Sequence, residues 1–125
     1  MLYPILSISA GAAIGALLRW WLGILLNPSF PAIPMGTLAA NIIGCFLMGL
    51  FMTLTKEHLF FSQEMRLAIA TGFLGGLTTF STFSAETVTL IVQKQYFLTL
   101  AIVALHVAGS LIATILGIIA IKFIL

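Results

Sequence analysis

Long apolar stretches, separated by short polar or turn-rich connections, form the main pattern of this chain. A helix needs about 20 apolar residues to cross the hydrocarbon core of a bilayer. The pattern predicts four membrane-spanning helices at about residues 5–26, 35–55, 64–92 and 97–123. We therefore expect an all-α integral membrane protein, a single membrane domain over residues 1–125, with both termini on one side.

Composition supports this fold class and excludes several functions. The 125 residues are 62% hydrophobic and 6% charged, and the mean hydropathy is +1.25. Soluble domains carry about 25% charged residues, so this chain could not cover a water-facing surface. A net charge of +2 is too small to indicate a nucleic-acid partner, and a single cysteine excludes an intrachain disulfide.

The third apolar stretch contains a segment that is poorly suited to an unbroken helix. It reads Gly-Phe-Leu-Gly-Gly-Leu-Thr-Thr-Phe-Ser-Thr-Phe-Ser-Ala-Glu from residue 72 to residue 86. Glycine costs a helix about 1 kcal/mol relative to alanine, and threonine hydroxyls can bond local backbone groups instead. Broken backbone at membrane depth is tolerated only where protein buries it or where it lines a cavity. We expect a functional break in the third helix near residues 75–79.

Two phenylalanines follow the predicted break on one helix face. Phe80 and Phe83 are spaced i, i+3 and are interleaved with hydroxyl residues that include Ser81. The edge of an aromatic ring is electropositive, so ring edges can line an anion path without a full positive charge. Taken alone, such a pair is also typical of ordinary core packing.

Polar residues on one face of the second and fourth spans extend the possible path. Thr37 and Asn41 share a narrow arc of the second span, where the Asn41 amide could join helices or contact a ligand. His106, Ser110 and Thr114 share an arc of the fourth span. This second stripe could also be packing contacts, but a histidine in a membrane is costly without a partner, which favours a polar path.

Two charged residues lie within the predicted spans. Arg19 continues the i, i+4 series of Gly11 and Gly15, whose small size permits close helix approach. Its guanidinium could either extend to the membrane interface or attract an anion to the entrance of a path. Glu86 could be a proton carrier, a partner for a hydroxyl group, or a cap in an aqueous vestibule.

The orienting charges are almost balanced. Lys56, Arg66 and Lys122 fall on the side of the termini, and Arg19 and Lys94 fall towards the opposite side. The positive-inside rule needs an excess of Lys and Arg on the cytoplasmic side. We therefore expect dual topology and an antiparallel homodimer, whose interface also offers more room for a transport path than four packed helices.

Three stretches resemble the Fluc/CrcB family of fluoride channels. The most specific is Gly72-Phe-Leu-Gly-Gly-Leu-Thr-Thr-Phe-Ser-Thr-Phe83, which is similar to the signature of the family's third helix. Gly15-Ala-Leu-Leu-Arg19 and Gly36-Thr-Leu-Ala-Ala-Asn41-Ile-Ile-Gly44 resemble its first and second helix motifs. His106 departs from the family pattern, because that position is often Tyr.

The resemblance implies a passive channel that exports fluoride across the inner membrane, formed by an antiparallel dual-topology homodimer in the lipid membrane. Arg19 would lie near a vestibule and Glu86 near a pore end. Backbone carbonyls of Gly75 and Thr78 from both subunits would hold a structural sodium ion at the dimer centre, and free carbonyls at a half-helix end suit such an ion. The residues assigned to the fluoride pore are Phe80, Phe83, Asn41, Thr37, Ser81, His106, Ser110 and Thr114.

Other functions remain open from the residues alone. One is a proton-coupled exporter that uses Glu86 and resembles the small multidrug-resistance transporters, although those rely on a carboxylate in the first span. Another is a scaffold without transport activity. An intramembrane hydrolase using Ser81 and His106 is remote, because the chain has no Asp to orient the histidine.

Overall fold

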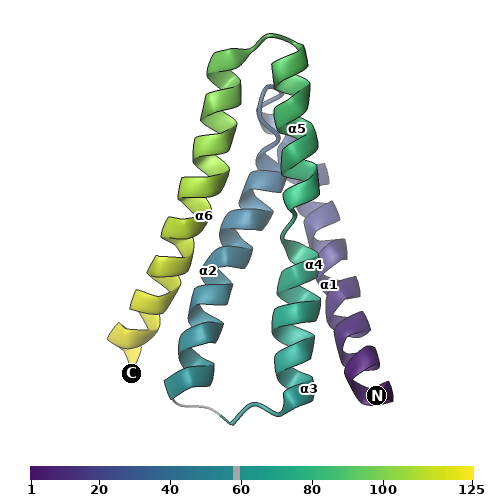
Figure 1. Cartoon of the computed structure of the whole chain (residues 1–125), viewed down its shortest axis with the longest axis vertical. Coiled ribbons are helices and arrows are strands. Elements are labelled where there is room, and N and C mark those ends of the chain that lie inside the picture. Colours follow the sequence, from purple (N-terminus) through teal and green to yellow (C-terminus); the bar gives the residue numbers. More distant parts are fainter. Residues whose placement is uncertain (58–59) are drawn as a thin grey trace.

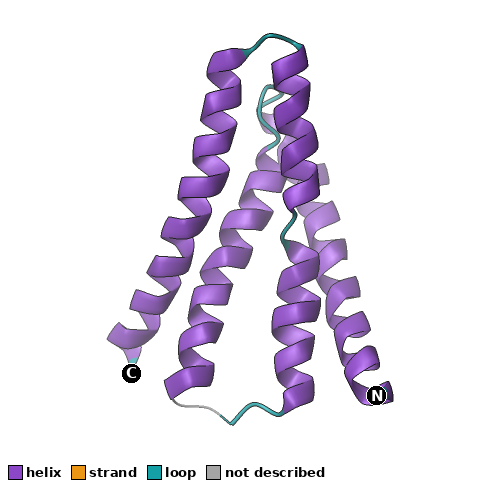
Figure 2. Cartoon of the chain, in the orientation of Figure 1, coloured by secondary structure: helices purple, strands orange, loops and turns teal. Residues whose placement is uncertain are grey.

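The computed structural model describes residues 1–57 and 60–125 as helices and connections, with no strand among these residues (Figure 2). In chain order the helices are α1 (Leu2–Leu26), the 3₁₀ helix η1 (Asn27–Ser29), α2 (Met35–Glu57), α3 (Gln63–Arg66), the π-helix η2 (Leu67–Leu74), α4 (Gly75–Leu77), α5 (Phe80–Val92) and α6 (Tyr96–Ile124). Within the described residues, four segments are long and apolar enough to cross a membrane: Leu2–Ser29, Met35–Lys56, Gln63–Val92 and Tyr96–Ile124. The predicted all-α membrane protein with four spans is thereby confirmed.

The spans run side by side along the long axis of the molecule (Figure 1). α2 packs most extensively on α6, and α1 packs most extensively on η2 and α4. Both termini lie at one end, opposite the turn that joins α5 to α6 (Figure 1). This arrangement confirms the prediction that the termini share one side.

Glycines bring the backbone of α1 into direct contact with η2. A Cβ atom on Gly15 would collide with the Phe73 carbonyl, and one on Gly72 would lie 2.6 Å from the Ile8 carbonyl oxygen. Small residues at such an interface allow the close packing that drives helix association in lipid. The predicted role of the first-span glycines in close approach is therefore confirmed at Gly15.

The contact between α2 and α6 is built in the same way. A Cβ atom on Gly49 would collide with the Thr114 carbonyl, and one on Gly117 would collide with the Phe46 carbonyl. The two glycine contacts fix α1 to the third span and α6 to the second span. They hold the frame in which the polar side chains meet.

Helices α4 and α5 are separated by two extended residues. Thr78 has φ −84° and ψ 152°, and Thr79 has φ −148° and ψ 124°. The Thr79 hydroxyl accepts a hydrogen bond from the Thr82 N–H at 3.2 Å and thereby caps the start of α5. We call these two residues the Thr78–Thr79 junction. Extended backbone is confined to the last two residues of the predicted 75–79 stretch, because α4 itself is helical.

Two connections at the end opposite the termini are fastened by hydrogen bonds. Asn27 Oδ1 accepts a bond from the Gly36 N–H at 2.8 Å and ties η1 to the start of α2. In the turn between α5 and α6, Lys94 has φ 58°, and the Gln95 N–H donates to the Leu90 carbonyl at 2.9 Å. Both connections are short, so the helices that each one joins run antiparallel and pack beside each other: α1 with α2, and α5 with α6 (Figure 1).

We expect Gly15→Ala to lower stability by about 1–3 kcal/mol, because the added methyl group has no space against the Phe73 backbone. Gly23→Ala is the matched control in the same helix, since its Cβ would meet only the Asn27 side-chain amide at 3.4 Å. Thermal unfolding of the purified variants in detergent measures the difference. Equal midpoints for the two variants would contradict the close backbone contact.

Candidate functional site

A single side chain holds both backbone groups of Thr79. The Asn41 amide nitrogen Nδ2 donates to the Thr79 carbonyl at 3.0 Å, and the Thr79 N–H donates to Asn41 Oδ1 at 2.7 Å. Asn41 is only 8% exposed. Unpaired backbone groups are costly in the bilayer, where water cannot satisfy them. Asn41 therefore makes the extended conformation of the Thr78–Thr79 junction possible at membrane depth.

Asn41 also connects the junction to α6. Its Nδ2 lies 3.0 Å from His106 Nδ1, and His106 is 4% exposed. The His106 ring stacks on Phe83, with ring centroids 4.6 Å apart and an interplanar angle of 29°. Phe80 in turn contacts Phe83 edge to face, with ring centroids 5.5 Å apart and an interplanar angle of 70°. Four residues from three spans therefore lie together beside the junction: Asn41, His106, Phe83 and Phe80.

The two phenylalanines differ in burial. Phe83 is 8% exposed and belongs to the core, whereas Phe80 is 77% exposed. The spacing i, i+3 correctly predicts that they are neighbours. Only Phe83 has its ring enclosed by the same chain.

A cavity of about 330 Å³ opens beside this cluster. We call it the junction cavity. It is lined by Asn41, Cys45, Thr78, Thr79, Phe80, Phe83, His106, Val107, Ser110 and Leu111. Five of the residues predicted for the pore are thus brought together: Phe80, Phe83, Asn41, His106 and Ser110.

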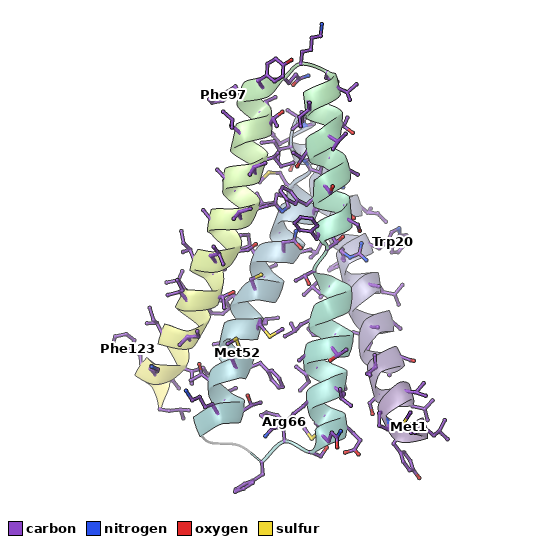
Figure 3. The ribbon with its side chains drawn as sticks, in the orientation of Figure 1. Met1, Trp20, Met52, Arg66, Phe97 and Phe123 are labelled. Carbon is purple, nitrogen blue, oxygen red and sulfur yellow. The ribbon has the colours of Figure 1, made fainter. Side chains whose placement is uncertain are left out.

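Arg19 lines a second cavity of about 410 Å³, which we call the arginine cavity. Thr79 lines both cavities. The Arg19 Nε donates to the Gly76 carbonyl at 3.0 Å, so the guanidinium binds the backbone of α4 and does not simply extend to the interface. Trp20, the neighbouring residue on α1, also lines this cavity and is labelled in Figure 3.

Thr37 and Glu86 form a separate pair. The Thr37 hydroxyl donates to Glu86 Oε1 at 2.6 Å, which confirms the interpretation of Glu86 as a partner for a hydroxyl group. Thr37 lines the arginine cavity, and Glu86 lines a third cavity of about 440 Å³. Neither is among the residues that line the junction cavity.

The predicted stripe on α6 divides between two environments. His106 and Ser110 line the junction cavity. The Thr114 hydroxyl donates to the Ser110 backbone carbonyl at 3.1 Å, and its own backbone packs against α2. Ser81 is exposed, with its hydroxyl oxygen 3.3 Å from Thr79 Oγ1. Thr114 and Ser81 thus lie outside the set that lines the cavity.

Two carbonyls at the junction lose their usual helical donors. A helical carbonyl accepts from the N–H four residues later. The Thr79 N–H donates to Asn41, which diverts it from the Gly75 carbonyl, and the Thr82 N–H donates to the Thr79 hydroxyl, which diverts it from the Thr78 carbonyl. Carbonyl oxygens of this kind suit a hard cation. Among the described residues, no cluster of three or more His, Cys, Asp or Glu side chains could hold a metal ion.

The structure adds two residues that the sequence pattern did not single out for the site. Cys45 lines the junction cavity, one helical turn after Asn41, and that i, i+4 spacing was the available signal. Thr79 contributes through its backbone, for which no side-chain pattern gives a signal.

Comparison with known proteins identifies the family. The sequence model described as "CrcB-like protein, Camphor Resistance (CrcB)" matches residues 6–118. A fluoride-specific ion channel FluC of Nitrosospira multiformis is 54% identical over 123 residues, covering 98% of this chain and 96% of the relative. A protein of the same name from Thiobacillus denitrificans is 51% identical over 119 residues, covering 95% and 96%. These matches confirm the resemblance read from the helix motifs, and the chain belongs to the CrcB-like family.

Proposed function

We propose that this multi-pass membrane protein is a fluoride-selective ion channel that passively exports fluoride across the inner membrane and so reduces fluoride toxicity. The observation that carries the proposal is the junction cavity, where an amide, an imidazole and two aromatic rings meet beside extended backbone. The relatives named as fluoride-specific channels support the ion and the non-enzymatic role. The comparisons do not support the multidrug-exporter alternative based on Glu86.

The chemistry of the cavity lining suits a small anion. No lining residue is an acid, so none would repel an anion, and none is a Lys or Arg that would bind one too tightly for release. Ring edges of Phe80 and Phe83 offer weak positive potential. Fluoride is small and a strong hydrogen-bond acceptor, and replacing its hydration shell requires polar groups at close range.

A second copy of the chain would complete the path. Phe80 lines the cavity and is 77% exposed, which leaves one side of the aromatic pair open in a single subunit. The charges that orient the chain remain balanced in three dimensions. Arg66 lies at the end of the termini, as the labels of Arg66 and Met1 in Figure 3 make plain, and Lys94 lies in the turn at the opposite end. These features favour the antiparallel, dual-topology homodimer.

The carbonyls of Gly75 and Thr78 would hold the structural sodium ion at the centre of that dimer. Their usual helical donors are diverted to Asn41 and to the Thr79 hydroxyl. When bound, the ion would supply positive charge to otherwise unpaired carbonyl oxygens from both subunits.

Exchange of sodium for N-methylglucamine should lower the thermal midpoint of the purified dimer, because a ligand that binds only the folded state stabilises it. Thermal unfolding over a sodium series measures the effect, with potassium in place of sodium as the control for ionic strength. An unchanged midpoint across the series would remove sodium from the proposal.

We expect Phe80→Ile and Phe83→Ile each to slow fluoride efflux from liposomes by about tenfold or more, which corresponds to a barrier raised by about 1.4 kcal/mol. The substitution removes a ring edge from the path while keeping an apolar side chain. Phe51→Ile is the matched control, because Phe51 packs on Phe61, with ring centroids 5.4 Å apart, and does not line the junction cavity. Wild-type efflux in both test variants would show that the rings only fill the core.

A reporter fused to the C-terminus should appear on both faces of the membrane. Lys94→Gln removes one charge from the side opposite the termini, so it should shift the population towards a cytoplasmic C-terminus. Paired fusions to an enzyme active only outside the cytoplasm and to a protein that fluoresces only inside it measure the two populations. A wild-type reporter found on one face alone would contradict dual topology.

A further inference from the structure

The peptide group between Thr78 and Thr79 is fixed in direction. It is trans, so its N–H and C=O point to opposite sides. The Thr79 N–H donates to Asn41 Oδ1 at 2.7 Å, and the Thr78 carbonyl therefore points away from Asn41. Its usual helical donor, the Thr82 N–H, is bound to the Thr79 hydroxyl. The direction of this free carbonyl thus depends on the contacts that hold Thr78 and Thr79.

The side chain of Thr78 is held in one rotamer against α2. Its hydroxyl donates to the Leu74 carbonyl at 2.8 Å, and its backbone N–H donates to the same oxygen at 3.0 Å. The methyl group Cγ2 then lies against Gly44, where an added Cβ atom would collide with it. A β-branched side chain has few alternative rotamers. Thr78 can therefore keep this position only if residue 44 is glycine.

Arg19 holds the same helix end from α1. Its Nε donates to the Gly76 carbonyl at 3.0 Å, whereas the neighbouring Gly75 carbonyl has lost its helical donor, the Thr79 N–H. Glycine has the freest backbone of any residue, so a pair of glycines at a helix end needs an external contact to keep one conformation. Arg19 supplies that contact and leaves the Gly75 carbonyl free but restrained.

We propose that Gly44 and Arg19 are positioning residues for the sodium site, which aim the free carbonyls of Thr78 and Gly75 from α2 and α1. This inference rests on the proposed function, from which it takes the ion and its two carbonyl ligands. It adds the residues that give these carbonyls their direction. It also gives Arg19 a role besides lining the arginine cavity.

Positioning decides the affinity of a site that is built from backbone carbonyls. Each carbonyl oxygen offers only a partial negative charge, and no cluster of three or more acidic, His or Cys side chains occurs in the described part of the chain. Ligands that are already held in place lose less freedom on binding. Residues that orient the ligands of a metal therefore affect its affinity without touching it.

A sodium titration of thermal unfolding measures this affinity without a transport assay. Stability rises with the logarithm of the ligand concentration above its dissociation constant, so midpoints over a sodium series give an apparent Kd. N-methylglucamine keeps the ionic strength constant. We expect Gly44→Ala to raise the apparent Kd for sodium by about tenfold or more, because the new methyl group displaces Thr78.

A compensating substitution tests whether Gly44 acts through Thr78. Thr78→Ser removes the methyl group Cγ2 that the new side chain would meet, and it keeps the hydroxyl that bonds the Leu74 carbonyl. The Gly44→Ala/Thr78→Ser protein should therefore regain the wild-type apparent Kd. If Gly44→Ala alone does not fold, recovery of a folded dimer that binds sodium supports the same conclusion. A double variant that does not fold, or binds sodium as weakly as Gly44→Ala, would overturn this role of Gly44.

Gly49→Ala is the matched control in the same helix. Its Cβ would collide with the Thr114 carbonyl, away from the Thr78–Thr79 junction. This variant should lower the midpoint at every sodium concentration and leave the apparent Kd unchanged. An apparent Kd that is the same in folded Gly44→Ala and Gly49→Ala would show that Gly44 serves only helix packing.

Arg19→Met tests the other side of the site. It removes the donor to the Gly76 carbonyl together with a positive charge. Loss of the charge would favour a nearby cation, whereas loss of the hydrogen bond would release the Gly75–Gly76 backbone, so the two effects have opposite signs. We expect the second effect to dominate and to raise the apparent Kd by about tenfold. An unchanged or lower value would remove Arg19 from the proposal.

The wild-type titration separates this inference from the proposed function. A wild-type midpoint that does not depend on sodium would overturn the sodium site itself, and absence of fluoride efflux would overturn the channel. A wild-type protein that responds to sodium, with the same apparent Kd in Gly44→Ala and Arg19→Met, would overturn the positioning roles alone.

Discussion

The pairing of Asn41 with both backbone groups of Thr79 is the interaction on which the rest of the structure depends. Inside a bilayer a chain can leave the helical conformation only if its backbone N–H and C=O groups find other partners. Asn41 provides both partners from one side chain, at 2.7 and 3.0 Å. The remaining features of the site follow from this local solution.

Several consequences arise at the Thr78–Thr79 junction. The helix restarts with Thr79 as its cap, which sets the rotation of α5 and brings Phe83 against His106. Diversion of the Thr79 N–H leaves the Gly75 carbonyl without its helical donor. Arg19 binds the neighbouring Gly76 carbonyl from α1, so both sides of the junction are held. One interruption thereby places an aromatic pair beside carbonyls that have lost their helical donors.

Glycine contacts make the surrounding frame rigid enough for this arrangement. At the α1–η2 and α2–α6 interfaces, no space remains for even a methyl group between the backbones. Each pair of spans is therefore fixed by backbone packing, which is how helices associate closely in lipid. Asn41, which lies on α2, links the two pairs, because its side chain bonds the Thr79 backbone of the third span and also His106 of α6.

The sequence predicted the four spans well, because the bilayer imposes length and apolarity on every crossing segment. It predicted that Phe80 and Phe83 are neighbours, because helical spacing alone determines that contact. Spacing could not show that the α6 stripe divides, with His106 facing the cavity and Thr114 packed on α2, since both share one helical arc.

Other features had no local signal in the sequence. The bond between Thr37 and Glu86 joins residues 49 positions apart and depends on how the spans are rotated. The π-helix η2 has no hydrophobic period that distinguishes it from an α-helix over eight residues. The orientation of the Asn41 amide can be deduced only when the position of the Thr79 backbone is known, and hydrophobic periodicity does not give that position.

Ion efflux from liposomes that contain the purified wild-type protein tests the central claim most directly. Fluoride and chloride electrodes, used in parallel on the same preparation, measure both ions. The account predicts rapid fluoride release with no chloride release, because the junction cavity places uncharged polar side chains and aromatic rings close to a small anion. Folded dimers that release no fluoride, or that release both ions alike, would contradict it.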